Sequence, residues 1–178
     1  MELTELGIAG CYLLRPRVFQ DGRGRFVKPL AASQLTARGL RADFVEQYYS
    51  TSARGVIRGM HFQLPPHDHA KLVYCASGAV TDVLLDLRRR SAYGRHVSLS
   101  LTADSGHAVY IAAGVAHGFV ATLEPALMVY NVTSEHARAH DAGVRWDSFG
   151  CDWGVAESVV SERDRGFAPL SEFVSPFE

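Results

Sequence analysis

The chain has 178 residues, of which 47% are hydrophobic and 21% are charged, with a formal net charge of −1. This length predicts one domain spanning residues 1–178, and the near-neutral charge excludes general attraction to nucleic acid or to an anionic membrane surface. No apolar run approaches the roughly 20 residues of a membrane helix, and the opening MELTELGIAG lacks a signal-peptide pattern. With three scattered cysteines, which suit a reducing compartment, these features predict a cytoplasmic protein.

In chain order, residues 30–40 (LAASQLTARGL) predict one short helix that ends near Gly39. From residue 44 onward, short apolar or alternating runs are separated by turn-like residues. These runs predict strands at 44–52, 55–63, 71–78, 79–87, 96–101, 107–114, 117–123 and 126–134. After Trp146 the chain is loop-rich, with one helical turn expected at 161–164. Many short strands with little helix predict an all-β barrel or sandwich of the jelly-roll kind.

Two of these strands have alternating patterns that assign side chains to faces. In the strand 55–63, alternation places His61 on one face and Arg58 on the other. In the strand 79–87 it places Asp82 and Asp86 together on one face. That acidic face is then either exposed to solvent or the wall of a polar cavity.

The segment RGMHFQLPPHDHAKLVY (58–74) is rich in histidine and permits two interpretations. In the first, His67 and His69 bind a metal, because a His-x-His spacing places both imidazoles on one side of an extended chain. His117 would add a ligand from a later strand, although position 73 is Val, where metal-binding barrels of the cupin class carry a glutamate. Because PPHDH also has the composition of a turn, His67 and His69 are alternatively exposed loop residues.

In the second interpretation, the chemistry belongs to His61 and Lys71, which flank the histidine pair. A lone histidine inside a barrel is most often a packing residue, and so is a strand tyrosine such as Tyr130. A lysine beside a core strand must instead be paired, exposed at an edge or functional, because an isolated buried ammonium is very costly. A histidine base next to a fixed cation suits removal of a proton adjacent to a carbonyl. Tyr130 is then a candidate proton donor from the opposite face.

Seven segments of the chain follow one another in an order typical of one family. They are DGRGRF, RGMHFQ, AKLVYCASGAVTDVLLDLRRRS, YIAAGVAHGF, VYNVTSE, GVRWD and VVSERD. This series resembles the dTDP-4-dehydrorhamnose 3,5-epimerase family over nearly the whole length. The resemblance implies a cupin-type β-jelly-roll, a homodimer, and no metal or organic cofactor. It also implies epimerisation of the carbons that flank the 4-keto group of a nucleotide-linked 6-deoxyhexose.

The resemblance further implies roles for single residues. His61 corresponds to the family's base, and Asp164 in VVSERD corresponds to the carboxylate that pairs with it. Lys71 corresponds to the lysine near the keto oxygen, and Tyr130 to the acid on the opposite face. A carboxylate on the far nitrogen of a histidine fixes its tautomer and raises its basicity. Because the 4-keto group acidifies protons on both neighbouring carbons, one base is able to serve two epimerisations in turn.

Other positions match the family's substrate pocket. Arg23 and Arg58 match arginines that hold the diphosphate, which suits the fork geometry of a guanidinium group. Phe19 and Phe26 match positions around the nucleotide base, where an aromatic ring can stack or simply pack in the core. The remaining matched pocket positions are Gln47 and His117.

Three positions depart from the family pattern. Lys28 stands where a glutamate usually accepts a hydrogen bond from the N3–H of thymine. A lysine only donates, so a cytidine-linked sugar, whose base offers acceptors at N3 and O2, competes with a thymidine-linked one. Tyr49 stands at a common asparagine position and His136 at a common second tyrosine. Either of these changes could restrict epimerisation to one carbon, C3 or C5, instead of both.

The favoured function is therefore a cofactor-independent epimerase that acts on a nucleotide-diphosphate-sugar in deoxysugar biosynthesis, with dTDP as the nucleotide. The nearest alternative is an epimerase of a CDP-linked 4-keto-deoxysugar that acts at one carbon. Two alternatives belong to other classes. One is a metal-dependent cupin that uses His67, His69 and His117, and the other is a nucleotide-sugar-binding cupin without catalysis.

Overall fold

Strands dominate the computed structural model, which describes residues 1–178. The strands are β1 (Glu2–Glu5), β2 (Tyr12–Arg15), β3 (Val18–Asp21), β4 (Gly24–Val27), β5 (Glu46–Ser52), β6 (Val56–Gln63), β7 (Lys71–Asp86), β8 (His96–Thr102), β9 (Ala108–Ile111), β10 (Val115–Val132), β11 (Asp141–Gly143) and β12 (Val159–Val160). The helices are α1 (Ala32–Thr36), α2 (Glu162–Arg165) and the 3-10 turn η1 (Leu170–Glu172). The predicted all-β fold with a short N-terminal helix and a loop-rich C-terminal segment is confirmed.

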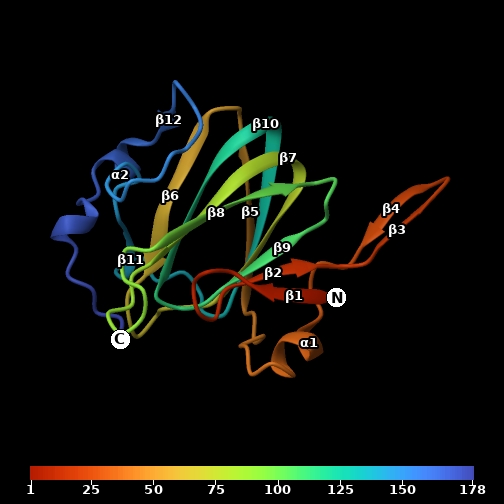
Figure 1. The fold of residues 1–178 in the computed structure, drawn as a ribbon, viewed down its shortest axis with the longest axis horizontal. Coiled ribbons are helices and arrows are strands. Elements are labelled where there is room, and N and C mark those ends of the chain that lie inside the picture. Colours follow the sequence, from red (N-terminus) through yellow and green to blue (C-terminus); the bar gives the residue numbers. More distant parts are fainter.

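Ten strands form one hydrogen-bonded network, and β3 and β4 form a separate two-stranded sheet. The network runs in the order β1-β2-β9-β7-β10-β6-β11, with β5 paired to β10, β8 to β7 and β12 to β6. Figure 1 shows these strands wrapping around a common interior. Apart from the parallel pair β12–β6, the strand pairs are antiparallel, as a jelly-roll requires.

Two of the predicted turns are bends inside long strands. The segments 71–78 and 79–87 join as β7, and 117–123 and 126–134 join within β10. At the bend, Gly78 has a positive φ of 70°, and a Cβ there would lie 2.8 Å from the carbonyl oxygen of Pro125. The β7–β10 register shifts at the same place. Each long strand therefore changes neighbours: β7 pairs first with β9 and then with β8.

The first 30 residues hold four short strands that the alternation pattern did not predict. Strands β3 and β4 form a hairpin that projects away from the barrel (Figure 1) and is almost entirely exposed. The predicted helix at 30–40 is present, but it is shorter and covers Ala32–Thr36. Its Leu35 is fully buried against Leu14 and Leu72. No helix of the structure is long and apolar enough to cross a membrane.

The C-terminal segment covers the outer side of strand β6 and brings α2 to the site. Its Trp153, Val160 and Phe177 are buried in one cluster with Ile57 and Met60 of β6. Strand β12 then runs parallel to the start of β6. This packing places α2, whose helical turn was predicted, against the strand that carries His61 (Figure 1).

Candidate active site

His61 of β6 and the buried Asp164 of α2 form a hydrogen-bonded pair. The His61 Nε2 lies 2.7 Å from Asp164 Oδ1, and the N–H of Gly59 donates to the other carboxylate oxygen at 3.2 Å. Ser161 caps the helix by accepting the N–H of Asp164, which fixes the carboxylate's position. Burial alone raises the pKa of Asp164, but the hydrogen bond and charge of His61 outweigh it, so this pKa lies below its ordinary value.

This pairing determines which nitrogen of His61 can act as a base. An ionised carboxylate only accepts hydrogen bonds, so Nε2 of His61 carries a hydrogen and donates it in a hydrogen bond to Asp164. The lone pair of the neutral ring then lies on Nδ1. The ring itself is partly exposed and borders a cavity. His61 is thus arranged as a base with a fixed tautomer.

Lys71 is a buried cation beside this histidine. It begins strand β7, is 5% exposed, and donates from Nζ to the backbone oxygen of His61 at 3.1 Å. Burial lowers the pKa of Lys71 to about 8, although the charges of Asp141 and Asp82 partly oppose this effect. Lys71 therefore keeps its charge at neutral pH and presents it to a small space next to the base.

Tyr130 lies on β10 with its hydroxyl group 3.4 Å from the hydroxyl of Ser50. Its ring stacks on that of Tyr48, with centroids 4.7 Å apart and planes 13° apart. Burial raises the pKa of Tyr130 well above its ordinary value, so the phenol stays protonated. A protonated phenol is able to donate a proton to a carbon or oxygen held near it.

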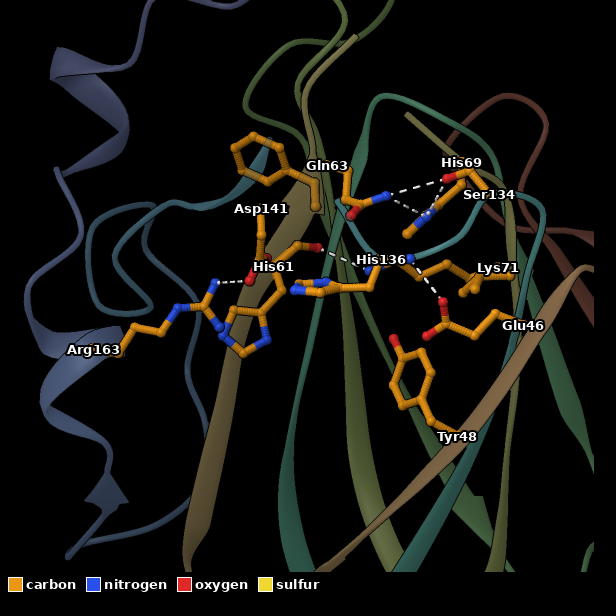
Figure 2. A pocket seen from close by; sticks show the side chains of 12 residues that line it. Glu46, Tyr48, His61, Gln63, His69, Lys71, Ser134, His136, Asp141 and Arg163 are labelled. Carbon is orange, nitrogen blue, oxygen red and sulfur yellow. Dashed lines mark hydrogen bonds and ion pairs between the residues drawn. The ribbon is translucent and has the colours of Figure 1, made fainter. Parts of the chain in front are cut away.

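Two neighbouring cavities bring these groups together. The inner cavity, of about 180 Å³, is lined by Tyr48, Ser50, Arg58, His61, Lys71, His117, Phe119 and Tyr130. The outer cavity, of about 380 Å³, is lined by Glu46, Tyr48, His61, Phe62, Gln63, His69, Lys71, Val132, Ser134, His136, Asp141 and Arg163. Figure 2 shows the outer cavity with His61, Asp141 and Arg163 on one side and Lys71, Glu46 and Tyr48 on the other. Tyr48, His61 and Lys71 border both cavities.

His117 lines the inner cavity and belongs to a second histidine–carboxylate pair. Its Nε2 lies 2.6 Å from Asp82 Oδ1, and both side chains are buried. The His117 ring meets Tyr130 edge-on, with centroids 5.9 Å apart. The acidic face of β7 is therefore not exposed to solvent: Asp82 supports the cavity wall, and the buried Asp86 pairs with Arg88.

Strict alternation along β6 was wrong for Arg58. The register of β6 on β10 shifts between His117 and Phe119, so that Arg58 and His61, three residues apart, pair with residues only two apart. This bulge turns both side chains towards the inner cavity. The Arg58 guanidinium donates to the hydroxyl of Ser52 at 3.0 Å and remains partly exposed at the cavity edge.

The histidines of the metal interpretation do not converge on one point. His67 lies against His140, with ring centroids 4.4 Å apart. His69 lies 3.0 Å from the hydroxyl of Ser134 and 3.2 Å from the amide nitrogen of Gln63 (Figure 2). Burial lowers the pKa of His69 to about 3, so its ring is neutral. No three His, Cys, Asp or Glu side chains of the chain are placed to hold a metal ion together.

Several of the expected pocket residues lie elsewhere in the single chain. Gln47 and Tyr49 alternate with Tyr48 on β5 and border neither cavity, and Tyr49 is 70% exposed. His136 does border the outer cavity, and its N–H donates to Glu46 at 2.7 Å.

The other four expected binding residues belong to the projecting β3–β4 hairpin and its end. Phe19 and Phe26 are exposed and lie across from each other, with ring centroids 6.3 Å apart. The Arg23 side chain is 91% exposed and pairs with Asp21 at 2.6 Å. Lys28 follows the hairpin and is exposed. Within one chain, this hairpin lies apart from strand β6, which carries His61 (Figure 1), and none of its residues lines either cavity.

Sequence reasoning missed some residues that the structure gathers at the cavities. Tyr48 and Ser50 line the inner cavity, and Asp141 and Arg163 form an ion pair of 2.7 Å in the outer one. Alternation in 44–52 could have grouped Tyr48 with Ser50. Nothing in the spacing pointed to Asp141 or Arg163, because their partner residues are distant in sequence.

The fold and this cluster together define the class of the protein. A histidine fixed by a carboxylate, a buried lysine and a protonated tyrosine surround one cavity inside an antiparallel β-barrel. These groups are suited to moving protons next to a carbonyl group. The chain is thus an enzyme of the isomerase kind in a barrel that belongs to the cupin class.

Comparison with known proteins identifies the family. The sequence model described as dTDP-4-dehydrorhamnose 3,5-epimerase matches residues 5–172. A dTDP-4-dehydrorhamnose 3,5-epimerase from Sinorhizobium fredii is 36% identical, with 100% of this chain and 94% of the relative covered. The Pseudomonas aeruginosa enzyme of the same name is 38% identical, with 93% of each chain covered. The chain belongs to the dTDP-4-dehydrorhamnose 3,5-epimerase family and is a carbohydrate epimerase.

Solved structures agree with this assignment and confirm the cupin-type jelly-roll. The dTDP-4-dehydrorhamnose 3,5-epimerase from Elizabethkingia anophelis superposes with a TM-score of 0.91 at 32% identity, covering 97% of both chains. NovW, a 4-keto-6-deoxy sugar epimerase of Streptomyces spheroides, gives 0.93 at 34% identity, covering 97% of this chain and 88% of that one. The Legionella pneumophila enzyme, solved with dTDP-4-keto-L-rhamnose, gives 0.93 at 26% identity, covering 99% and 98%.

Proposed function

We propose that this chain inverts C3, C5 or both in a dTDP-linked 4-keto-6-deoxyhexose, with residues 1–178 acting as one catalytic domain. One observation carries the proposal. The His61–Asp164 pair, the Lys71 ammonium and the Tyr130 hydroxyl lie around one cavity, although they come from four different segments of the chain. Family membership supports a deoxysugar substrate, and the cavity supplies the groups that its epimerisation needs.

The proposed reaction is a proton exchange through an enolate. Nδ1 of His61 removes the proton from a carbon next to the 4-keto group, and the C–H electrons form a carbon–carbon double bond. The carbonyl electrons move to the oxygen, where the Lys71 ammonium stabilises the negative charge. Tyr130 then donates its proton to the opposite face of the same carbon, and the carbonyl re-forms. His61 and the tyrosinate return to their starting states by exchanging protons with water.

Asp164 and Arg58 support this chemistry without donating or removing the substrate's protons. The Asp164 carboxylate stabilises the imidazolium that forms when His61 takes the proton. Arg58 lies at the edge of the inner cavity, where its guanidinium suits a diphosphate oxygen. His117 and His136 would contact the sugar, a role supported by their positions at the inner and outer cavities.

The names of the relatives favour dTDP over CDP as the nucleotide, and so does the dTDP-sugar bound to the Legionella enzyme. The exposed Lys28 leaves room for a different base preference, because its ammonium has no protein partner that would hold it away from a ligand. The dTDP-linked substrate is therefore the first to test, with the CDP-linked sugar as its competitor.

We also propose a homodimer that acts in the cytoplasm. The projecting hairpin carries two exposed phenylalanines and Arg23, which are suited to a nucleotide but lie away from the His61 cluster of their own chain. In a homodimer, the hairpin of one subunit would reach the cavity of its partner. The three free cysteines suit a reducing compartment.

Proton NMR in D2O tests the proposed reaction. The enzyme is incubated separately with dTDP- and CDP-linked 4-keto-6-deoxyglucose, and deuterium uptake at C3 and C5 is followed. We expect uptake with the dTDP sugar and inverted product, with both lost in His61→Ala. Undiminished uptake in that variant would remove His61 as the base, and uptake with the CDP sugar alone would reverse the nucleotide assignment.

A further inference from the structure

Tyr48 is the nearest aromatic neighbour of the proposed proton donor. It lies directly opposite Tyr130 in the β5–β10 pairing. The two rings stack nearly parallel, with planes 13° apart and centroids 4.7 Å apart. Rings on directly paired residues of adjacent strands are close enough to constrain one another.

Tyr130 is also held by the barrel core, where it belongs to a cluster of 15 buried residues. Its only side-chain hydrogen bond is a long one of 3.4 Å to Ser50. The edge of His117 bounds the ring on another side, and His117 is itself fixed by Asp82. Tyr48 supplies the contact across the face of the ring. Without it, Tyr130 would lose its one stacked aromatic neighbour, while its core packing, the edge contact with His117 and the hydrogen bond to Ser50 would remain.

The ring of Tyr48, rather than its hydroxyl group, makes this contact. Its hydroxyl has no hydrogen-bond partner within the protein and points towards the outer cavity (Figure 2). The side chain is 41% exposed on the edge strand β5, so the barrel core does not depend on it. Tyr48 nevertheless borders both cavities, where a bound sugar would pass.

We infer that Tyr48 is a positioning residue that holds the Tyr130 ring where its proton reaches the substrate carbon. This inference rests on the proposed function. It assigns Tyr48 to the second half of the reaction alone, because His61 and Lys71 are held by Asp164 and by backbone contacts that do not involve Tyr48. Loss of the stacked ring should therefore impair proton delivery while proton removal continues.

The test compares two products that NMR in D2O distinguishes. Deuterated substrate of unchanged configuration reports removal and return of the proton by His61. Deuterated, inverted product reports delivery by Tyr130. In Tyr48→Leu we expect the ratio of inversion to exchange without inversion to fall at least about tenfold, since a small displacement of a reacting group is costly. In Tyr48→Phe, which keeps the ring, the ratio should stay within about twofold of wild type.

Two further variants make the result decisive. Tyr93→Leu removes an equally exposed tyrosine, 41%, from a distant surface, and its ratio should match wild type. Tyr48→Thr repeats the truncation with a β-branched residue suited to an edge strand, in case the leucine variant does not fold. An unchanged ratio in both truncations, a parallel loss of both products, or equal damage from Tyr48→Phe would overturn the inference. If wild type itself neither exchanges nor inverts the dTDP sugar, the proposed function fails instead.

Discussion

Replacing Asp164 with asparagine should inactivate His61 as a base, because it reverses the tautomer of the His61 ring. In the native pair, one carboxylate oxygen accepts from His61 Nε2 and the other from the N–H of Gly59. An amide has a single oxygen. If that oxygen faces Gly59, the amide N–H2 faces His61, whose Nε2 must then accept, and the proton moves to Nδ1. The nitrogen that should remove the substrate proton is then already protonated.

The other amide orientation keeps the correct tautomer at a cost that can be worked out. It turns N–H2 towards the buried N–H of Gly59, and an unsatisfied buried donor costs about 1–3 kcal/mol. Loss of the charge-assisted bond to the imidazolium costs about another 1.5–3 kcal/mol. At about 1.4 kcal/mol per tenfold, Asp164→Asn should lower kcat by about 10² to 10⁴.

Asp164→Ala separates these two costs. Alanine imposes neither tautomer, so only the loss of the charged partner remains, and kcat should fall by about 10 to 10². The assay is initial-rate deuterium uptake at saturating substrate for the three proteins, with thermal melting as a control for folding. Asparagine should be more damaging than alanine, although it is the closer mimic of aspartate. Equal losses, or a more active asparagine variant, would refute the tautomer argument.

Three further outcomes follow from other parts of the molecule. Because burial lowers the pKa of Lys71 to about 8, the rate should fall as pH rises through that value and the cation is lost, whereas a rate constant up to about pH 10 would contradict its role. A chelator should leave activity unchanged, because no three His, Cys, Asp or Glu side chains are placed to hold a metal ion together, and activity lost to a chelator and restored by an added divalent metal would contradict this. Phe119→Ala should lower the free energy of unfolding by about 3–5 kcal/mol in urea, because the ring is 1% exposed, and a loss below about 1 kcal/mol would show that the core collapses around it.

Much of the barrel could be predicted because most of its strands are short apolar or alternating runs separated by turn residues. The pattern failed where a turn composition sits inside a strand. Gly78 and the Glu124–Pro125 pair have turn chemistry, yet they bend β7 and β10 without ending either strand. The early hairpin was missed for the opposite reason. Strands β3 and β4 are four residues each and exposed, so they bury no face that would impose an apolar alternation.

The site residues, too, could be predicted from the sequence where their contacts are local, and were missed by spacing rules where their partners are distant in the chain. His61 and Lys71 could be identified as a pair because they lie ten positions apart in the sequence, with one turn between them. Asp164 lies 103 residues from His61, and only the family resemblance identified it, since no spacing rule links such partners. The Asp82–His117 pair was missed although both residues had been singled out, one as part of an acidic face and one as a pocket residue. Pairing across β7 and β10 decides that contact, and it is a tertiary property.

The bulge in β6 explains why alternation was misleading at the residues that matter most. A regular strand would have turned Arg58 away from the cavity that holds His61. The register shift opposite His117 and Phe119 adds one residue to β6, so both side chains face inward. The proposed phosphate-binding cation and the proposed base thereby come from one strand, three residues apart. The barrel tolerates the irregularity because the residue inside the bulge, Gly59, has no side chain. A Cβ at this position would lie only 2.7 Å from the Cα of Gly118 in β10. The same glycine presents its N–H to Asp164, so one irregularity serves both the binding and the catalytic sides of the cavity.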